Sequence, residues 1–74
     1  MKVQLQSTTK IVELNGIPAR IWEGYSEGGV KVHAYIARVP IDKNEPNAEE
    51  FERELKECVP PSVSVEAIPL RLIL

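Results

Sequence analysis

Two runs of β-prone residues separated by a two-residue turn form the clearest pattern in the chain. Ile11–Leu14 precedes Asn15-Gly16, and Ile17–Trp22 follows it. Asn-Gly favours a type I′ turn, because both central residues of that turn need a positive φ. The pattern predicts a β-hairpin whose register is fixed by the turn, with Leu14 opposite Ile17, Val12 opposite Ala19 and Lys10 opposite Ile21.

Alternating apolar residues extend this hairpin in both directions. We expect a first strand over about residues 2–14, bent or frayed at 7–9, and a second over about 17–25. Ser26-Glu27-Gly28-Gly29 predicts the next turn, because glycine accepts the positive φ that hairpin turns require. A third strand over about 30–39 is limited by Pro40, which has no N–H to donate. Together the three strands predict an antiparallel meander.

A helical period follows the third strand. Asn47 is the expected N-cap, with Glu50 closing a capping box, and Pro60-Pro61 ends the helix. Between them, apolar residues recur at spacings of three and four, which predicts one apolar stripe formed by Ala48, Phe51, Leu55 and Cys58.

The last segment, residues 63–74, alternates again and predicts a fourth strand that Pro69 confines to an edge. It can pair parallel with strand one or strand three, and we favour strand one, because its Leu-rich side then joins the core. The sequence therefore predicts a single α+β domain over residues 1–74. We expect a three-stranded antiparallel meander, one helix packed on one face, and a C-terminal fourth strand.

The alternation also assigns side chains to the two faces of the sheet. With an even number of residues in the second turn, the core face under the helix holds Val12, Leu14, Ile17, Ala19, Ile21, Tyr25, Val30, Val32, Ala34 and Ile36. One helix covers one face, so we expect the other face to be open, with nothing of its own chain over the indole of Trp22. Trp, Tyr and Arg are enriched at binding hot spots, and this face predicts an interaction surface of Ile11, Arg20, Trp22, His33, Tyr35 and Val39.

Charge is distributed unevenly along the chain, whose net charge is −2. Residues 42–57 hold seven acids and three bases, hence −4, whereas the remainder holds six bases and four acids, hence +2. This balance lacks the basic footprint of a duplex-DNA binder. One cysteine allows no intrachain disulfide, and neither a signal peptide nor an apolar run of membrane-spanning length is visible, so we expect a cytoplasmic protein.

Residues with catalytic potential are few. His33 has no second ligand at metal-binding spacing and no partner for acid–base catalysis. Cys58 and His33 would make a minimal nucleophile–base pair, but the predicted stripe and sheet face direct them to opposite sides. The helix glutamates match a solvated face. We therefore expect no catalytic residue, no metal and no cofactor.

These features predict a small non-enzymatic interaction module. We expect it to pair with itself as a homodimer, or with another protein, through the open face, and we expect no membrane partner. The alternative is single-stranded nucleic-acid binding through the same aromatic and arginine residues, although the acidic total opposes it.

The order of the predicted elements also suggests a partner. It is similar to the partial ribonuclease-H-like domain of HicB-type antitoxins, and this resemblance implies an antitoxin-like protein whose acidic helix meets a basic protein. The ribonuclease H active-site acids have no counterparts, because the first strand has Glu13 near its end and the fourth has only Glu66.

Overall fold

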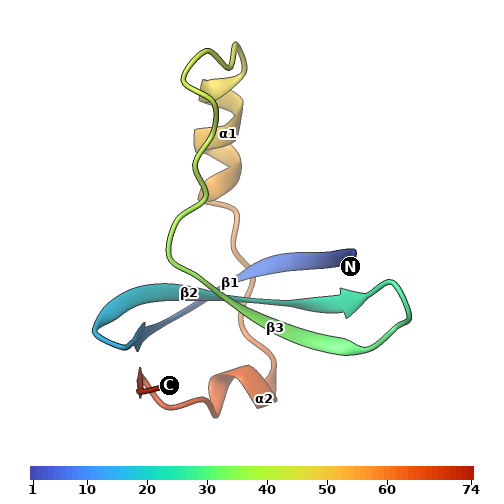
Figure 1. Cartoon of the computed structure of the whole chain (residues 1–74), viewed down its shortest axis with the longest axis vertical. Coiled ribbons are helices and arrows are strands. Elements are labelled where there is room, and N and C mark those ends of the chain that lie inside the picture. The colour runs from blue at the N-terminus through green and yellow to red at the C-terminus, as the bar shows by residue number, and fades with distance from the viewer.

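The computed structural model describes all 74 residues. Its elements follow in the order β1 (Val3–Leu14), β2 (Ile17–Ser26), β3 (Lys31–Ile36), α1 (Ala48–Leu55), α2 (Val63–Glu66) and β4 (Arg71–Leu72) (Figure 1). The strands form one sheet in the order β3-β2-β1-β4. The predicted α+β class is confirmed, with an antiparallel meander and a fourth strand that pairs parallel with β1. Neither helix has the length and apolar character needed to cross a bilayer.

The first turn has the backbone that its residues favour. Asn15 has a φ of 51° and Gly16 a φ of 83°, as a type I′ turn requires. The register beside the turn is the predicted one, with Leu14 opposite Ile17 and Val12 opposite Ala19.

Further from this turn, β1 contains a bulge. Its register with β2 shifts between Ser7 and Ile11, so the predicted pairing of Lys10 with Ile21 is wrong. The buried Thr8 stabilises the bulge, because its hydroxyl donates to the Ile21 carbonyl at 2.7 Å and accepts from the Lys10 N–H at 3.2 Å. The bend expected in this stretch of the first strand is therefore present.

The turn between β2 and β3 corrects the predicted faces of the sheet. Its loop has three residues, 27–29, because the Ser26 N–H donates to the Val30 carbonyl at 2.9 Å. Gly29 has a φ of 83°, which fits a three-residue hairpin loop with a bulged glycine. An odd loop reverses the parity that an even loop gives, and it places Ile21 opposite Tyr35 and Trp22 opposite Ala34.

The two faces therefore differ from the prediction along the third strand. One face, here called the α2 face, carries Val12, Ala19, Ile21, Glu23, His33 and Tyr35. The other, here called the open face, carries Ile11, Arg20, Trp22, Val32, Ala34 and Ile36. Strand-three residues predicted for the core thus lie on the open face, and two residues predicted for the interaction surface lie on the α2 face.

The core lies between the α2 face and α2. Val12, Ile21 and Val65 are buried, and Tyr35, Ile68 and Leu72 pack against them. The hydroxyl of Ser62 caps α2 by accepting from the Val65 N–H at 3.4 Å. The prediction of a strand over 63–74 is wrong outside Arg71–Leu72, and 63–66 form a helical turn instead. The pattern of this short run also fits one helical turn.

The strand at the end of the chain is short. Only Arg71–Leu72 pairs with β1, opposite Glu13 and Leu14, which confirms strand one as its neighbour. The Arg71 Nε also lies 2.8 Å from the Glu13 carboxylate. Pro69 precedes this strand, and the strand is at an edge of the sheet, as predicted.

α1 is not the helix that covers the sheet. None of its residues is buried, and Figure 1 shows it standing away from the strands, with the loop that leads to it running alongside. The predicted capping box is also wrong. The side chain of Asn47 caps nothing, because its amide and the Asn47 N–H both donate to the Glu45 carboxylate at 3.1 Å.

The chain after α1 is fixed to the edge of β1. The Ser7 hydroxyl donates to the Glu57 carbonyl at 3.0 Å. The Val59 N–H then donates to the Ser7 carbonyl at 3.1 Å, and the Thr9 N–H donates to the Val59 carbonyl at 3.0 Å. Here the chain passes from the open face to the α2 face, so α1 and α2 lie on opposite sides of the sheet (Figure 1).

Candidate interaction surface

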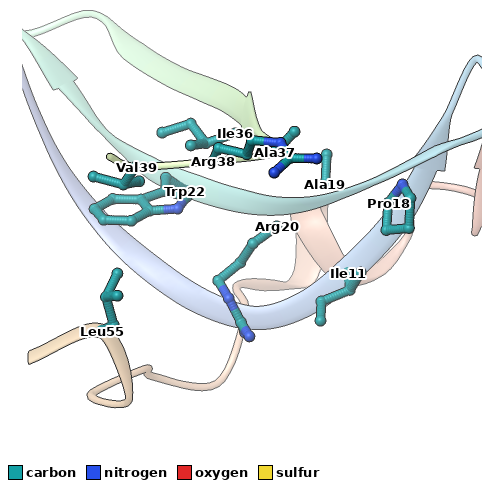
Figure 2. Close-up of a pocket in the computed structure, with 10 residues that line it drawn as sticks. All are labelled: Ile11, Pro18, Ala19, Arg20, Trp22, Ile36, Ala37, Arg38, Val39 and Leu55. Carbon is teal, nitrogen blue, oxygen red and sulfur yellow. The ribbon is translucent and has the colours of Figure 1, made fainter. Parts of the chain in front are cut away.

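The open face holds a groove at the foot of α1. Its volume is about 330 Å³. The lining comes from β1, β2, the end of β3 with the following loop, and the last residue of α1 (Figure 2). Seven of the ten lining residues are hydrophobic and the other three are Pro18 and two arginines, so the groove suits an apolar occupant: Ile11, Pro18, Ala19, Arg20, Trp22, Ile36, Ala37, Arg38, Val39 and Leu55.

The indole of Trp22 is partly sheltered, which corrects the expectation that nothing of its own chain lies over it. The side chain is half-buried. Figure 2 shows Val39 beside the ring and Leu55 facing the same hollow from α1. On its other side Trp22 lines a second hollow together with Phe51. The foot of α1 thus shelters one end of the groove, while Ile11 at the other end is 49% exposed.

Two arginines give the groove a positive charge. The Arg20 Nη1 donates to the Thr8 carbonyl at 2.8 Å, which holds this guanidinium against the bulge of β1. Arg38 forms no ion pair within the chain. The groove lining includes no carboxylate. Its polar character is therefore entirely cationic.

The six predicted interaction residues separate into two sets. Four lie together on the groove: Ile11, Arg20, Trp22 and Val39. His33 and Tyr35 lie on the α2 face, where His33 is exposed and Tyr35 packs against the core. The predicted surface did not include the other six lining residues: Pro18, Ala19, Ile36, Ala37, Arg38 and Leu55. The reversed parity moves Ile36 to this face, and α1 supplies Leu55.

A polar cluster that the sequence analysis missed fastens α2 to the sheet. The Glu23 carboxylate accepts from the Ser62 N–H at 2.7 Å and from the Ser62 hydroxyl at 2.6 Å. These two bonds stabilise the ionised form and lower the pKa of Glu23 from its ordinary value. The Lys31 Nζ adds a bond of 3.4 Å to the Ser64 hydroxyl. A serine directly after Pro60-Pro61 was the available signal, because serine is a preferred N-cap residue.

The side chains with catalytic or metal-binding potential lie apart. No three His, Cys, Asp or Glu side chains lie close enough to hold a metal ion. The Cys58 sulfur lies 3.6 Å from the Ser7 hydroxyl oxygen, at the edge of β1. His33 lies on the α2 face of β3, two strands away. The structure therefore assembles no nucleophile–base pair from these two residues.

The single chain exposes more surface than a compact domain of its size. Its accessible surface is 5839 Å², whereas a compact monomer of 8.3 kDa exposes about 4,600 Å². Its radius of gyration is 13.5 Å, against about 11 Å for a compact chain of this length. Only six residues are buried. The excess of about 1,200 Å² accompanies a helix in which no residue is buried.

Comparisons with known proteins identify no relative of this chain. The sequence matches no protein-family model, and no curated protein or solved structure is significantly similar to it.

Proposed function

We propose that the chain is a non-enzymatic protein-interaction module that works as a homodimer, with a second copy covering the open face. The excess of exposed surface supports this proposal. If each of two protomers buried its excess of about 1,200 Å², the interface would total about 2,400 Å², which lies in the range of obligate homodimers.

Trp22 is the proposed anchor of this interface. Aromatic side chains in partly enclosed pockets carry much of the energy of protein interfaces, and arginine beside them is similarly enriched. Trp22 lies in the groove beside Arg20 and Val39, with Ile11 at the open end. A small domain also gains stability by pairing with its own copy, because association adds apolar burial that the single core lacks.

The nucleic-acid alternative has less support. A single-strand platform needs several aromatic side chains on one surface, so that successive bases can stack. Tyr35 lies on the α2 face, which leaves Trp22 as the one aromatic residue of the open face of the sheet. The net charge of −2 further weakens attraction to phosphates.

Sedimentation analysis of the wild type and Trp22→Ala tests the proposal. We expect a wild-type dimer, and a dissociation constant raised by about thirtyfold in the variant, which corresponds to about 2 kcal/mol. The matched control is Tyr25→Ala, because Tyr25 is an exposed aromatic residue on the α2 face. A wild type that stays monomeric at high concentration would contradict the homodimer.

A further inference from the structure

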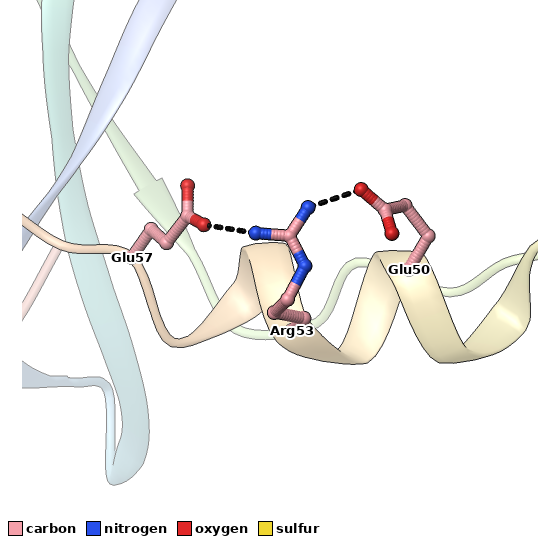
Figure 3. A network of polar contacts seen from close by, with 3 residues as sticks. All are labelled: Glu50, Arg53 and Glu57. Atoms are coloured by element: carbon pink, nitrogen blue, oxygen red, sulfur yellow. Dashed lines mark hydrogen bonds and ion pairs between the residues drawn. The ribbon is translucent and has the colours of Figure 1, made fainter.

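The apolar stripe of α1 is only partly covered by its own chain. Phe51 is half-buried and Leu55 is 43% exposed, and no residue of the helix is buried. The opposite side of α1 carries an ion-pair network in which Arg53 contacts both Glu50 and Glu57 (Figure 3). The helix thus has one side satisfied by its own charges and one apolar side that needs a partner surface.

Two acids border this stripe. With 3.6 residues per turn, Glu52 and Glu54 fall on the two edges of the stripe formed by Ala48, Phe51 and Leu55. Neither carboxylate has an ion-pair partner within the chain. This side of α1, whose Phe51, Glu54 and Leu55 line a hollow with Trp22, is therefore apolar along its middle and negative along its borders.

The groove on the open face has the complementary character. Its lining is mostly apolar, it carries the guanidinium groups of Arg20 and Arg38, and it holds no carboxylate. Arg38 lacks an ion-pair partner, as do the two acids of α1. A helix of the α1 type thus matches the groove in both hydrophobicity and charge.

α1 cannot lie in the groove of its own chain as the chain is arranged. The bonds from Ser7 to Glu57 and Val59 fix the end of the helix to the edge of β1. From that point α1 extends away from the sheet (Figure 1). Only Leu55, its last residue, reaches the groove, at the Trp22 end. The rest of the groove remains free for a helix from another molecule.

We propose that the homodimer forms by helix exchange, with α1 of each protomer lying in the groove of the other. The apolar stripe then covers the region around Trp22 and Ile36, and the bordering acids face Arg20 and Arg38. A two-fold axis makes the exchange reciprocal, so one contact is formed twice. This arrangement rests on the proposed homodimer and names the surface that each copy contributes.

Mixing two charge-reversal variants tests the exchange. Arg38→Glu changes the groove, and Glu54→Arg changes the border of the helix. Each variant alone places like charges in both of its contacts, so its dissociation constant should rise at least about tenfold. In a mixed dimer both contacts pair opposite charges, and mixing the two variants should restore association as a heterodimer. Glu49→Arg is the matched control, because Glu49 lies on the side of α1 away from the stripe.

The outcomes separate this inference from the proposed homodimer. Suppose that Trp22→Ala weakens the dimer but that neither charge variant lowers its affinity. The helix exchange is then overturned, and the homodimer remains. Suppose instead that a chain that carries both Arg38→Glu and Glu54→Arg regains its association while the mixture of single variants does not. That result places the contact within a protomer and also overturns the exchange. A monomeric wild type overturns both proposals and leaves a protein of another sequence as the occupant.

Discussion

Glu23 is the residue whose ionisation matters most for the fold. Both of its carboxylate oxygens are used by Ser62, and this pair joins the middle of β2 to the start of α2. No buried polar side chain of the protein lacks a hydrogen-bond partner. The Glu23–Ser62 pair therefore adds a polar attachment next to the apolar core, and the position of α2 depends on both.

The first prediction concerns this carboxylate. Because its pKa is lowered in the folded state, the ionised form stabilises the fold at pH values above the unfolded pKa, and this contribution is lost as the pH falls through the folded pKa. Glu23→Gln should cost about 1 kcal/mol at neutral pH, a figure that allows for the partial exposure of the site. In acid the wild type and the variant should converge.

Urea unfolding at a series of pH values, at fixed protein concentration, measures this difference. Glu27→Gln is the control, because Glu27 is exposed and its side chain makes no hydrogen bond. A gap between wild type and Glu23→Gln that stays constant into acid would show that the ionised carboxylate is not the stabilising form.

At the scale of elements, the local turn signal was the most reliable guide. Asn15-Gly16 fixes the first hairpin through backbone conformation alone, and the sequence therefore predicts β1, β2 and their register beside the turn. The second turn is less determined, because glycines serve loops of two, three or four residues. The three-residue loop moves Tyr35 and His33 to the other face, so both misplaced residues of the predicted site result from this one residue of loop length.

The short C-terminal elements depend on contacts that are distant in sequence. Val63-Ser64-Val65 alternates like a strand, but the Ser62 cap and the Glu23 carboxylate favour a helical turn. The direction of α1 is similarly set by bonds between Glu57, Val59 and β1. The apolar stripe of α1 was visible in the sequence, but the surface that it covers was not.

The second prediction distinguishes a helix from a strand at residues 63–66. In a strand Val63 and Val65 would share one face, and truncating either would have a similar cost. In the helix Val65 is fully buried, at 0% exposure, whereas Val63 is 88% exposed. Val65→Ala should therefore lower the free energy of unfolding by about 1–3 kcal/mol.

Val63→Ala is the internal control for this prediction. It carries the same change in helix propensity and should alter stability by less than about 0.5 kcal/mol. Equal losses in the two variants, measured by urea unfolding at one protein concentration, would contradict α2 as a helix.

At the scale of the whole molecule, the chain divides into a sheet with one covered face and an arm that leaves the other face. The covered face has a core of Val12, Ile21 and Val65. The arm, residues 37–58, carries most of the negative charge and ends in a helix of eight residues. Isolated helices shorter than about 12–15 residues are marginal in water, so α1 gains little stability from its own backbone. Packing against a second molecule would supply the stabilisation that α1 lacks.

The last prediction follows from this division and is measured by amide hydrogen exchange. In the dissociated chain, the amides of α1 should exchange almost as fast as unstructured peptide, because the helix buries no residue. In the dimer they should be protected, since the partner's groove covers the apolar stripe. Trp22→Ala provides the dissociated state at the same protein concentration. The amides paired between β1 and β2 serve as the control, because they should be protected in both states. Protection of α1 that is equal in the two states would show that the arm gains nothing from association, and helix exchange would then be wrong.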